Sequence, residues 1–341
     1  MATIKDIARL AGVSYSTVSK VINDYPDIGE DTRAKVLKII KEQNFSPNNS
    51  ARKLVTKKSR TIAVIMCGFD QLNENDIIPL QILKGVLISA QTINYEVAFY
   101  PITSFVQEQK SYAAFCRENN IEGAILSGIK TDDRYFHELI ETNIPCVLID
   151  VYAQGQNISS ISVDNVDASL TAVEYLIKNN HKHIGVINGK LQSVVGLERY
   201  AGYCQALINN NFPLNKKYVV DGQFQEDIAY EQCKQLLLNN PEITALFCAS
   251  DIMAIGAMQA LRELNLKIPE DISIIGFDDV PLAKYLTPAL TTIRQDFYKS
   301  GYDAMNLLID LIEKKSEKGL HAFNSYDLIV RNSVMKNKKE Y

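Results

Sequence analysis

Short apolar runs alternate with longer amphipathic stretches along the chain from residue 61 onward. The runs fall into two successive series, and each run predicts a buried strand. The predicted strands are 62–66, 96–100, 124–126, 146–149 and 161–163 in the first series, and 184–187, 218–220, 245–248, 272–275 and 291–294 in the second. Alternation of strands and helices on this scale indicates parallel sheets with both faces covered. We therefore expect two similar α/β lobes, with a last strand at 325–330.

The amino-terminal part of the chain follows the helical period instead. Thr3 and Asp6 are placed to form a capping box that opens a first helix. Gly12 stands where a left-handed residue ends a helix without a steric penalty, and Ser14 can cap a second helix. A third helix is predicted from about residue 30 to 43, with Val36, Leu37 and Ile40 as its apolar stripe. Two short helices joined by a tight glycine turn predict a helix-turn-helix.

The second helix has two distinct faces. Its apolar residues, Val18, Val21 and Ile22, should point inward, whereas its outward residues are Tyr15, Ser16, Thr17, Ser19 and Lys20. Hydroxyl groups, an aromatic ring and a cation near a helix N-terminus suit base edges and phosphates. A helical hairpin used only for packing is the alternative, and the polar outer face argues against it.

Charge divides the chain in the same place. Residues 1–60 hold twelve Lys and Arg against six Asp and Glu, and the remainder holds twenty-four against thirty-four. The overall charge of −4 therefore combines a basic head with an acidic body. Together with a groove-reading motif, the basic head predicts phosphate contacts and a steep salt dependence of DNA binding.

Three sequence blocks at characteristic mutual spacing carry a family resemblance. They are Thr-Ile-Lys-Asp-Ile-Ala at 3–8, Val-Ser-x-x-Thr-Val-Ser-x-Val-Ile-Asn at 13–23, and Ser-Pro-Asn-x-x-Ala-Arg-x-Leu at 46–54. In this order they resemble the lactose-repressor and galactose-repressor family of bacterial transcription regulators. The resemblance implies a sequence-specific repressor that is not an enzyme and that acts as a homodimer on a pseudo-palindromic operator.

The resemblance also assigns DNA contacts by position. Tyr15, Ser16 and Lys20 match the base-reading positions of the recognition helix. Residues 48–54 match a hinge helix, in which Leu54 matches a leucine that wedges into the minor groove; a buried linker residue is the alternative for Leu54. The full set of expected DNA-contacting residues is Thr3, Ser14, Tyr15, Ser16, Thr17, Ser19, Lys20, Asn23, Asn48, Ala51, Arg52, Leu54 and Lys57.

The expected organisation joins an all-α head to an α/β body. Residues 1–46 form the helix-turn-helix domain, and residues 47–60 the hinge helix and linker. Residues 61–335 resemble a two-lobed periplasmic-binding-protein-like domain for effector binding and dimerisation. We expect the first lobe to comprise about 61–162 and 292–322, the second about 163–291 and 323–335, and residues 336–341 to be a mobile tail.

Effector-binding candidates are sought where strands end, because ligands in such folds bind beyond the carboxyl ends of the strands. Asp164 and Asp278 each follow a predicted strand, and Arg199 and Asp278 match positions that hold ligand hydroxyls in sugar-sensing relatives. Phe224 matches a ring-stacking position, although core packing is equally consistent with it. Ser250 is expected to face the cleft, with Asp251 as the helix N-cap. With Asp70 and Asn73 of the polar loop 67–79, the expected set is Asp70, Asn73, Asp164, Arg199, Phe224, Ser250 and Asp278.

Composition excludes several other classes of protein. The chain has 341 residues with 46% hydrophobic content, which indicates more than one folded domain. No export signal opens it and no apolar run approaches about eighteen residues, so we expect a cytoplasmic protein without a membrane partner. Its cysteines lack any Cys-x-x-Cys pair and should be buried free thiols. No metal or cofactor is expected, because the histidines are scattered and neither a Gly-x-Ser-x-Gly nor a Gly-x-Gly-x-x-Gly motif occurs.

The function that these observations favour is repression of carbohydrate uptake or catabolism genes, controlled by a small sugar bound between the lobes. Two alternatives remain. The first is a carbon-control regulator whose corepressor is a phosphosugar or a phosphorylated partner protein, which extra cationic residues at the cleft would support; the sequence shows no clear set of them. The second is a sugar-binding module without DNA specificity.

Replacing Leu54 with Ala is expected to weaken operator binding, because a wedging side chain recovers the cost of unstacking through wider contact with the kinked duplex. Fluorescence anisotropy of a labelled operator at fixed salt measures the change. Equal affinity of wild type and Leu54→Ala would remove the wedge role.

Overall fold

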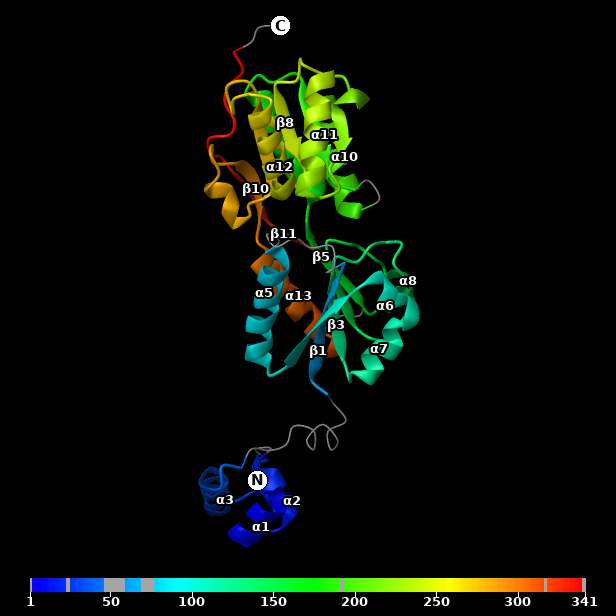
Figure 1. Ribbon diagram of the computed structural model, residues 1–341. Coiled ribbons are helices and arrows are strands. Elements are labelled where there is room, and N and C mark those ends of the chain that lie inside the picture. Colours follow the sequence, from blue (N-terminus) through cyan, green and yellow to red (C-terminus); the bar gives the residue numbers. More distant parts are fainter. Residues whose placement is uncertain are drawn as a thin grey trace. The chain divides into compact units, whose positions relative to one another are not determined.

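A computed structural model describes residues 2–22, 25–45, 59–68, 77–190, 193–315 and 318–338. The chain divides into two compact units, residues 1–59 and 60–341. Figure 1 shows a helical smaller unit and, within the larger unit, two stacked α/β lobes.

Three helices make up the described part of the smaller unit: α1 (Ile4–Ala11), α2 (Tyr15–Ile22) and α3 (Glu30–Glu42). The predicted capping box of Thr3 and Asp6 is present, and Gly12 ends α1 at φ 65°. A small core of buried apolar residues joins the helices, including Ile7, Val18, Val21 and Val36. The predicted stripe of α3 is wrong at one position, because Leu37 is exposed and Ile39 packs on this core beside Ile40.

The larger unit contains two six-stranded sheets among its described residues. The first has the order β11-β5-β4-β3-β1-β2 and the second β12-β10-β9-β8-β6-β7. The first sheet comprises β1 (Thr61–Cys67), β2 (Glu96–Ile102), β3 (Gly123–Ser127), β4 (Cys146–Ile149), β5 (Ile158–Val163) and β11 (His321–Asn324). The second comprises β6 (Ile184–Asn188), β7 (Val219–Asp221), β8 (Ala245–Cys248), β9 (Ser273–Asp278), β10 (Thr291–Gln295) and β12 (Tyr326–Ile329). Only β12 runs antiparallel to its described neighbour, so the predicted parallel sheets are confirmed.

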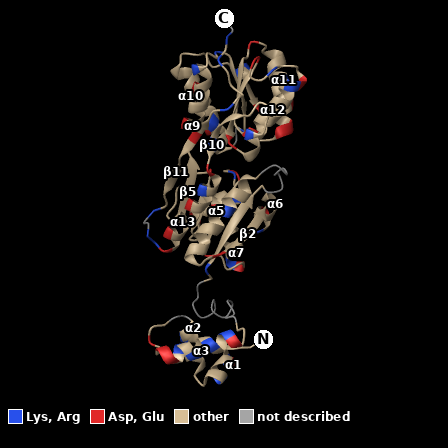
Figure 2. Cartoon of the chain, turned by 90° about the vertical axis from the view of Figure 1, so that its left-hand side faces the viewer, with Lys and Arg blue, Asp and Glu red and all other residues tan. Residues whose placement is uncertain are grey.

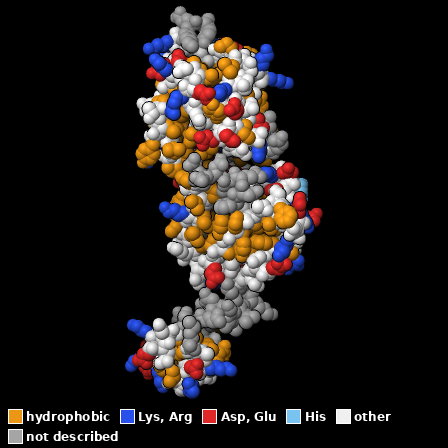
Figure 3. Space-filling model, in the orientation of Figure 1, with side chains coloured by type: hydrophobic (Ala, Val, Ile, Leu, Met, Phe, Trp, Pro, Cys, Tyr) orange, Lys and Arg blue, Asp and Glu red, His pale blue; other side chains and the backbone are white. Residues whose placement is uncertain are grey.

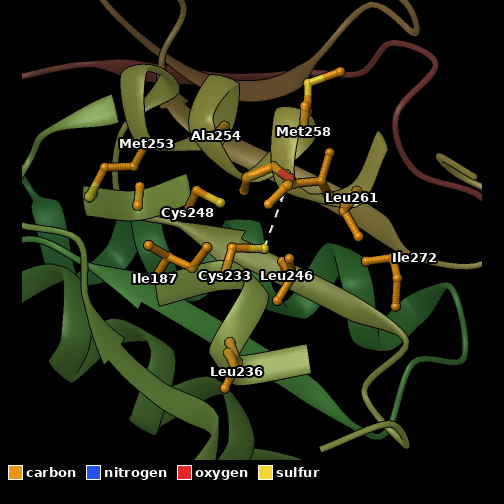
Figure 4. Packing of buried hydrophobic residues seen from close by; sticks show 14 of the residues in the cluster. Ile187, Cys233, Leu236, Leu246, Cys248, Met253, Ala254, Met258, Leu261 and Ile272 are labelled. Atoms are coloured by element: carbon orange, nitrogen blue, oxygen red, sulfur yellow. Dashed lines mark hydrogen bonds between the residues drawn. The ribbon is translucent and has the colours of Figure 1, made fainter. Parts of the chain in front are cut away.

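Helices cover both faces of each sheet. In the first lobe, α5 (Ile78–Ile93) and α13 (Phe297–Ile312) pack on one face, and α7 (Tyr112–Glu118) and α8 (Arg134–Glu141) pack on the other beside the short α6 (Ser104–Gln109). In the second lobe, α9 (Asn165–Lys178) and α10 (Val194–Asn209) cover one face, and α11 (Glu226–Asn239) and α12 (Asp251–Glu263) the other. Figure 4 shows the apolar layer between α11, α12 and their sheet. Single-turn helices lie at Lys216–Tyr218 and Pro281–Lys284.

The chain crosses between the lobes three times, and the sheet pairing corrects two predicted crossings. The sequence pattern predicts a return to the first lobe at about residue 292, but β10 pairs with β9, so the crossing follows Gln295. It also predicts that the second lobe resumes at residue 323, yet β11 pairs with β5 of the first sheet. Sequence reasoning missed β11 because it is a short, half-exposed edge strand without a continuous apolar run.

The described carboxyl-terminal residues remain attached to the second lobe. The backbone amide of Asn337 donates a hydrogen bond to the Asn179 carbonyl at 2.8 Å. Residue 337, within the predicted tail of 336–341, therefore contacts this lobe, and the mobility of the tail stays a prediction. No helix in the described ranges is long and apolar enough to cross a bilayer.

Candidate functional site

The first candidate site is the outer face of α2. The Ser14 hydroxyl accepts the Thr17 amide at 3.0 Å and lies 2.7 Å from the Ser16 hydroxyl, so it caps the helix as predicted. Tyr15 is half exposed, and the Lys20 ammonium pairs with Asp27 at the rim of this face. Thr3 uses its hydroxyl within the capping box of α1. Figure 2 marks lysine and arginine positions in blue along the ribbon of the same small unit, together with acidic positions in red.

Several predicted DNA-contacting residues lie outside the described ranges. They are Asn23, Asn48, Ala51, Arg52, Leu54 and Lys57. The described part of α2 therefore presents hydroxyls, one aromatic ring and one cation, and the hinge positions remain predictions.

The second candidate site is a cavity of about 350 Å³ between the two lobes. It lies at the carboxyl ends of the strands, where Cys67, Ser127 and Asp150 contribute from the first lobe. The second lobe contributes Arg199, Phe224, Ser250 and Asp278, all of which the sequence predicts for the site. Gln295 and Phe297, on either side of a crossing, complete the inner wall.

Arg199 is the most tightly held charge in the cavity wall, with 4% of its surface exposed. Its Nε donates to the Asn165 side-chain oxygen at 2.9 Å, and one terminal nitrogen donates to the Ala249 carbonyl at 2.6 Å. The same nitrogen lies 3.4 Å from an Asp278 carboxylate oxygen, and the guanidinium stacks 3.7 Å from the Phe277 ring centroid. A guanidinium that is buried this deeply needs such partners to offset its lost hydration.

Asp278 ends β9 in an unusual backbone conformation, with φ 115°. Its carboxylate accepts the Gln295 side-chain amide at 2.7 Å in addition to the contact with Arg199. The next residue, Asp279, pairs with Arg294 at 2.7 Å and with Arg331 at 2.6 Å. These ion pairs hold a strained turn that aims the Asp278 carboxylate at the cavity.

Asp150 directly follows β4 at φ 63° and lines the cavity from the first lobe. Burial raises the pKa of its carboxyl to about 6; Asp278 and Glu198 raise that pKa further, and Arg199 lowers it. The carboxyl therefore titrates close to neutral pH, where it can both donate and accept hydrogen bonds.

Phe224 both packs on the core and lines the cavity, which are the two positions that the sequence left open for it. It adopts φ 58° and packs on the core of the second lobe, and its ring also lines the cavity. A Cβ added at Gly189 would lie 2.0 Å from this ring, so the glycine makes room for it. Packing against the core therefore holds the ring in the position from which it lines the cavity.

Two expectations for the second lobe need correction. Ser250, not Asp251, is the N-cap of α12, because its hydroxyl accepts the Met253 amide at 3.2 Å. Asp251 is fully buried and instead accepts the Val280 amide at 2.9 Å and the Thr292 hydroxyl at 2.6 Å. Asp164 caps α9 through the Asp167 amide and is not among the described residues that line the cavity. Asp70 and Asn73 lie outside the described ranges.

Sequence reasoning missed several polar residues of the cavity, among them Lys130, Asp150, Lys190 and Gln295. Each lies at or just beyond the carboxyl end of a strand, so the rule that selected Asp278 applies to all of them. The two lysines also correct the expectation that the cleft lacks a set of cationic residues. A systematic search of the residues that follow each predicted strand would have found them.

The thiols and carboxylates of the described residues offer no obvious metal or redox chemistry. No group of three or more His, Cys, Asp or Glu residues in these ranges could hold a metal ion. The predicted free thiols are confirmed, since all the cysteines are unpaired and only Cys204 is more than slightly exposed. Burial raises the pKa of Cys67 and Cys116 to about 12, which keeps both thiols protonated.

We expect the stability of the larger unit to depend on pH through Asp150. Its folded-state pKa of about 6 exceeds the usual 3.8, so the folded state holds this proton more tightly. The associated stability is present below about pH 4 and is lost as pH rises through 6, at a cost of about 1–3 kcal/mol. Asp150→Asn should thus stabilise the protein at about pH 7.5 and much less at about pH 4.5 in denaturant unfolding. An equal gain at both pH values, or the same profile for the exposed control Asp132→Asn, would contradict this assignment.

Comparison with known proteins identifies both kinds of domain. Residues 3–48 match the family described as bacterial regulatory proteins, lacI family, and residues 173–334 match a periplasmic binding protein-like domain. The HTH-type transcriptional repressor PurR of Yersinia pestis (strain Pestoides F) is 35% identical over 319 residues, covering 93% of this chain and 92% of PurR.

Two solved structures extend the similarity to the whole fold. The Lac repressor dimer bound to operator and the anti-inducer ONPF is 28% identical, with a TM-score of 0.85 over 98% of this chain and 99% of that one. The transcriptional regulator CelR in complex with cellobiose is 26% identical, with a TM-score of 0.76 over 98% of this chain and all of that one. The chain therefore belongs to the lacI family of bacterial regulatory proteins and is a DNA-binding transcriptional repressor.

Proposed function

We propose that this repressor controls genes of carbohydrate uptake or catabolism, and that a small sugar in the cavity between its lobes sets its affinity for operator DNA. The observation that carries the proposal is the buried array of Arg199, Asp278 and Gln295 in the cavity wall. A guanidinium, a carboxylate and an amide, held at fixed angles, can pair with neighbouring hydroxyl groups of a sugar.

The apolar part of the cavity supports the same ligand class. Phe224 offers a ring face to the C–H face of a sugar, and Ile78, Val195 and Phe297 surround the remaining space. A related chain, CelR, is named as a complex with the disaccharide cellobiose. Polar groups on one side and an aromatic ring on the other form the usual arrangement of a carbohydrate site.

Both lobes line the cavity, so a ligand that contacts both shifts the population towards the closed arrangement. We propose that this shift reaches the operator through the first lobe and the hinge. A sugar that favours closed lobes with disordered hinges acts as an inducer, and one that favours ordered hinges acts as a corepressor.

We further propose a homodimer that forms through the first lobe and matches a two-fold operator. Exposed apolar residues line up at helical spacing on α5, namely Leu80, Leu87 and Ile88, with Phe99 on the edge strand β2. Figure 3 shows apolar side chains gathered on this face of the first lobe. Such a patch on a surface is typical of an interface.

Leu87→Lys is expected to weaken the dimer, because it places a charge within an apolar interface. Sedimentation equilibrium should give a mass of about two chains for wild type and a larger share of single chains for the variant. Ile140→Lys changes an exposed apolar residue on α8 and serves as the matched control. A wild-type monomer, or equal dissociation in both variants, would contradict the proposed interface.

Arg199→Ala is expected to abolish the response to sugar while operator binding without sugar persists. The operator is obtained by selection from a random DNA library, and its affinity is measured by fluorescence anisotropy with a panel of neutral and acidic sugars. An active sugar should change the wild-type affinity by about tenfold, or about 1.4 kcal/mol.

The exposed arginine of α12 provides the control, since Arg262→Ala leaves the cavity intact. Retained operator binding by Arg199→Ala shows that the variant is folded. A normal sugar response in Arg199→Ala, or no response of wild type to any sugar, would refute the proposed pocket.

A further inference from the structure

We propose that the sugar effector carries a negatively charged group, a carboxylate or a phosphate, which Lys130 and Lys190 bind. This inference rests on the proposed function and names the chemical class of its ligand. Lys130 follows β3 in the first lobe and Lys190 follows β6 in the second, and both line the cavity with half-buried side chains.

Neither lysine is neutralised within the described part of the chain. No hydrogen bond or ion pair of either ammonium group occurs there, whereas the other cation of the cavity, Arg199, has Asp278 beside it. Only the backbone groups of the two lysines are engaged, in the turns with Asp133 and Ser193. Both lysines line the cavity, and within the described ranges neither ammonium group has a partner that would compete with an anion.

The balance of charge in the cavity wall leads to the same conclusion. Among the described residues that line the cavity, the charged ones are three cations, Lys130, Lys190 and Arg199, and two carboxylates, Asp150 and Asp278. Asp278 is paired with Arg199 and Gln295, so even a fully ionised Asp150 offsets at most one of the two lysines. A neutral ligand would leave a positive excess in a partly desolvated space, and an anionic ligand would remove it.

Helix orientation adds to this positive potential. Val194 and Val195 in the first turn of α10 line the cavity, and so do Ser250 and Ile252 at the start of α12. The N-terminus of a helix carries a partial positive charge and attracts anions. The effect acts in the same direction as the lysines, which supply the specific contacts.

The positions of the two lysines also assign them a part in the switch. They belong to different lobes, so an anionic group that contacts both draws the lobes together. The hydroxyl-binding array of Arg199, Asp278 and Gln295 remains available for the rest of the sugar. A neutral sugar fills only this array and lacks the contact that spans the lobes.

The test compares matched ligands by isothermal titration calorimetry on the full chain. Each set holds one neutral sugar with its uronate and its 6-phosphate. The first set is D-galactose, D-galacturonate and D-galactose 6-phosphate. The second set is D-glucose, D-glucuronate and D-glucose 6-phosphate. Wild type is compared with Lys130→Gln, Lys190→Gln and the double variant. Lys182→Gln, an exposed lysine of the second lobe, is the matched control, and Arg199→Ala reports on the sugar site itself.

At least one acid should bind wild type about tenfold or more tightly than its neutral parent, and its affinity should fall as salt increases. The double variant should reduce that preference to within about twofold, while Lys182→Gln retains it. Preference for the uronate or for the 6-phosphate identifies the carboxylate or the phosphate as the bound group.

Two results would overturn the inference. One is a neutral sugar that binds as tightly as both of its acids, and the other is a preference for the acid that survives in the double variant. If a neutral sugar binds without such a preference and Arg199→Ala abolishes its binding, the proposed function stands and only the inference about charge fails. If no sugar binds at all, both fail.

Discussion

The desolvated guanidinium of Arg199 is the constraint around which the cavity between the lobes is built. Its partners come from the start of α9, the end of β8 and the end of β9, through Asn165, Ala249 and Asp278. Because removing any one partner would leave a buried charge poorly satisfied, these three elements must keep their relative positions. The strained backbone of Asp278 is stable in this setting, since the ion pairs of Asp279 hold the turn from the other side.

This fixed wall belongs to the second lobe, whereas the opposite wall belongs to the first. Parallel strands of both sheets direct their carboxyl ends, and the starts of the following helices, at one space. The chain crosses between the lobes after β5, β10 and β11, so a change in lobe closure passes directly into α13 and the first sheet. A ligand that binds both walls therefore acts on the whole larger unit.

Much of the fold could be predicted because its signals are local. Apolar runs marked most strands, and Thr3, Asp6 and Gly12 marked the ends of α1. Long-range pairing was harder: β11 lacks an apolar run, and only its register with β5 places it in the first sheet. The sequence predicts Asp251 as an N-cap, and only its long-range contacts with Val280 and Thr292 show a different role. Lys130 and Lys190 were missed because lysines that follow strands are usually solvated. The hinge residues, including Leu54, remain predictions.

The central claim is that occupancy of the cavity and operator affinity are linked, and reciprocity tests it most directly. The dissociation constant of the operator is measured with and without saturating effector, and that of the effector with and without saturating operator, on the same preparation at one salt concentration. Linkage requires the two ratios of dissociation constants to be equal, and we predict that each ratio is about ten or about one tenth. Ratios of one in both directions, despite tight binding of each ligand, would contradict it.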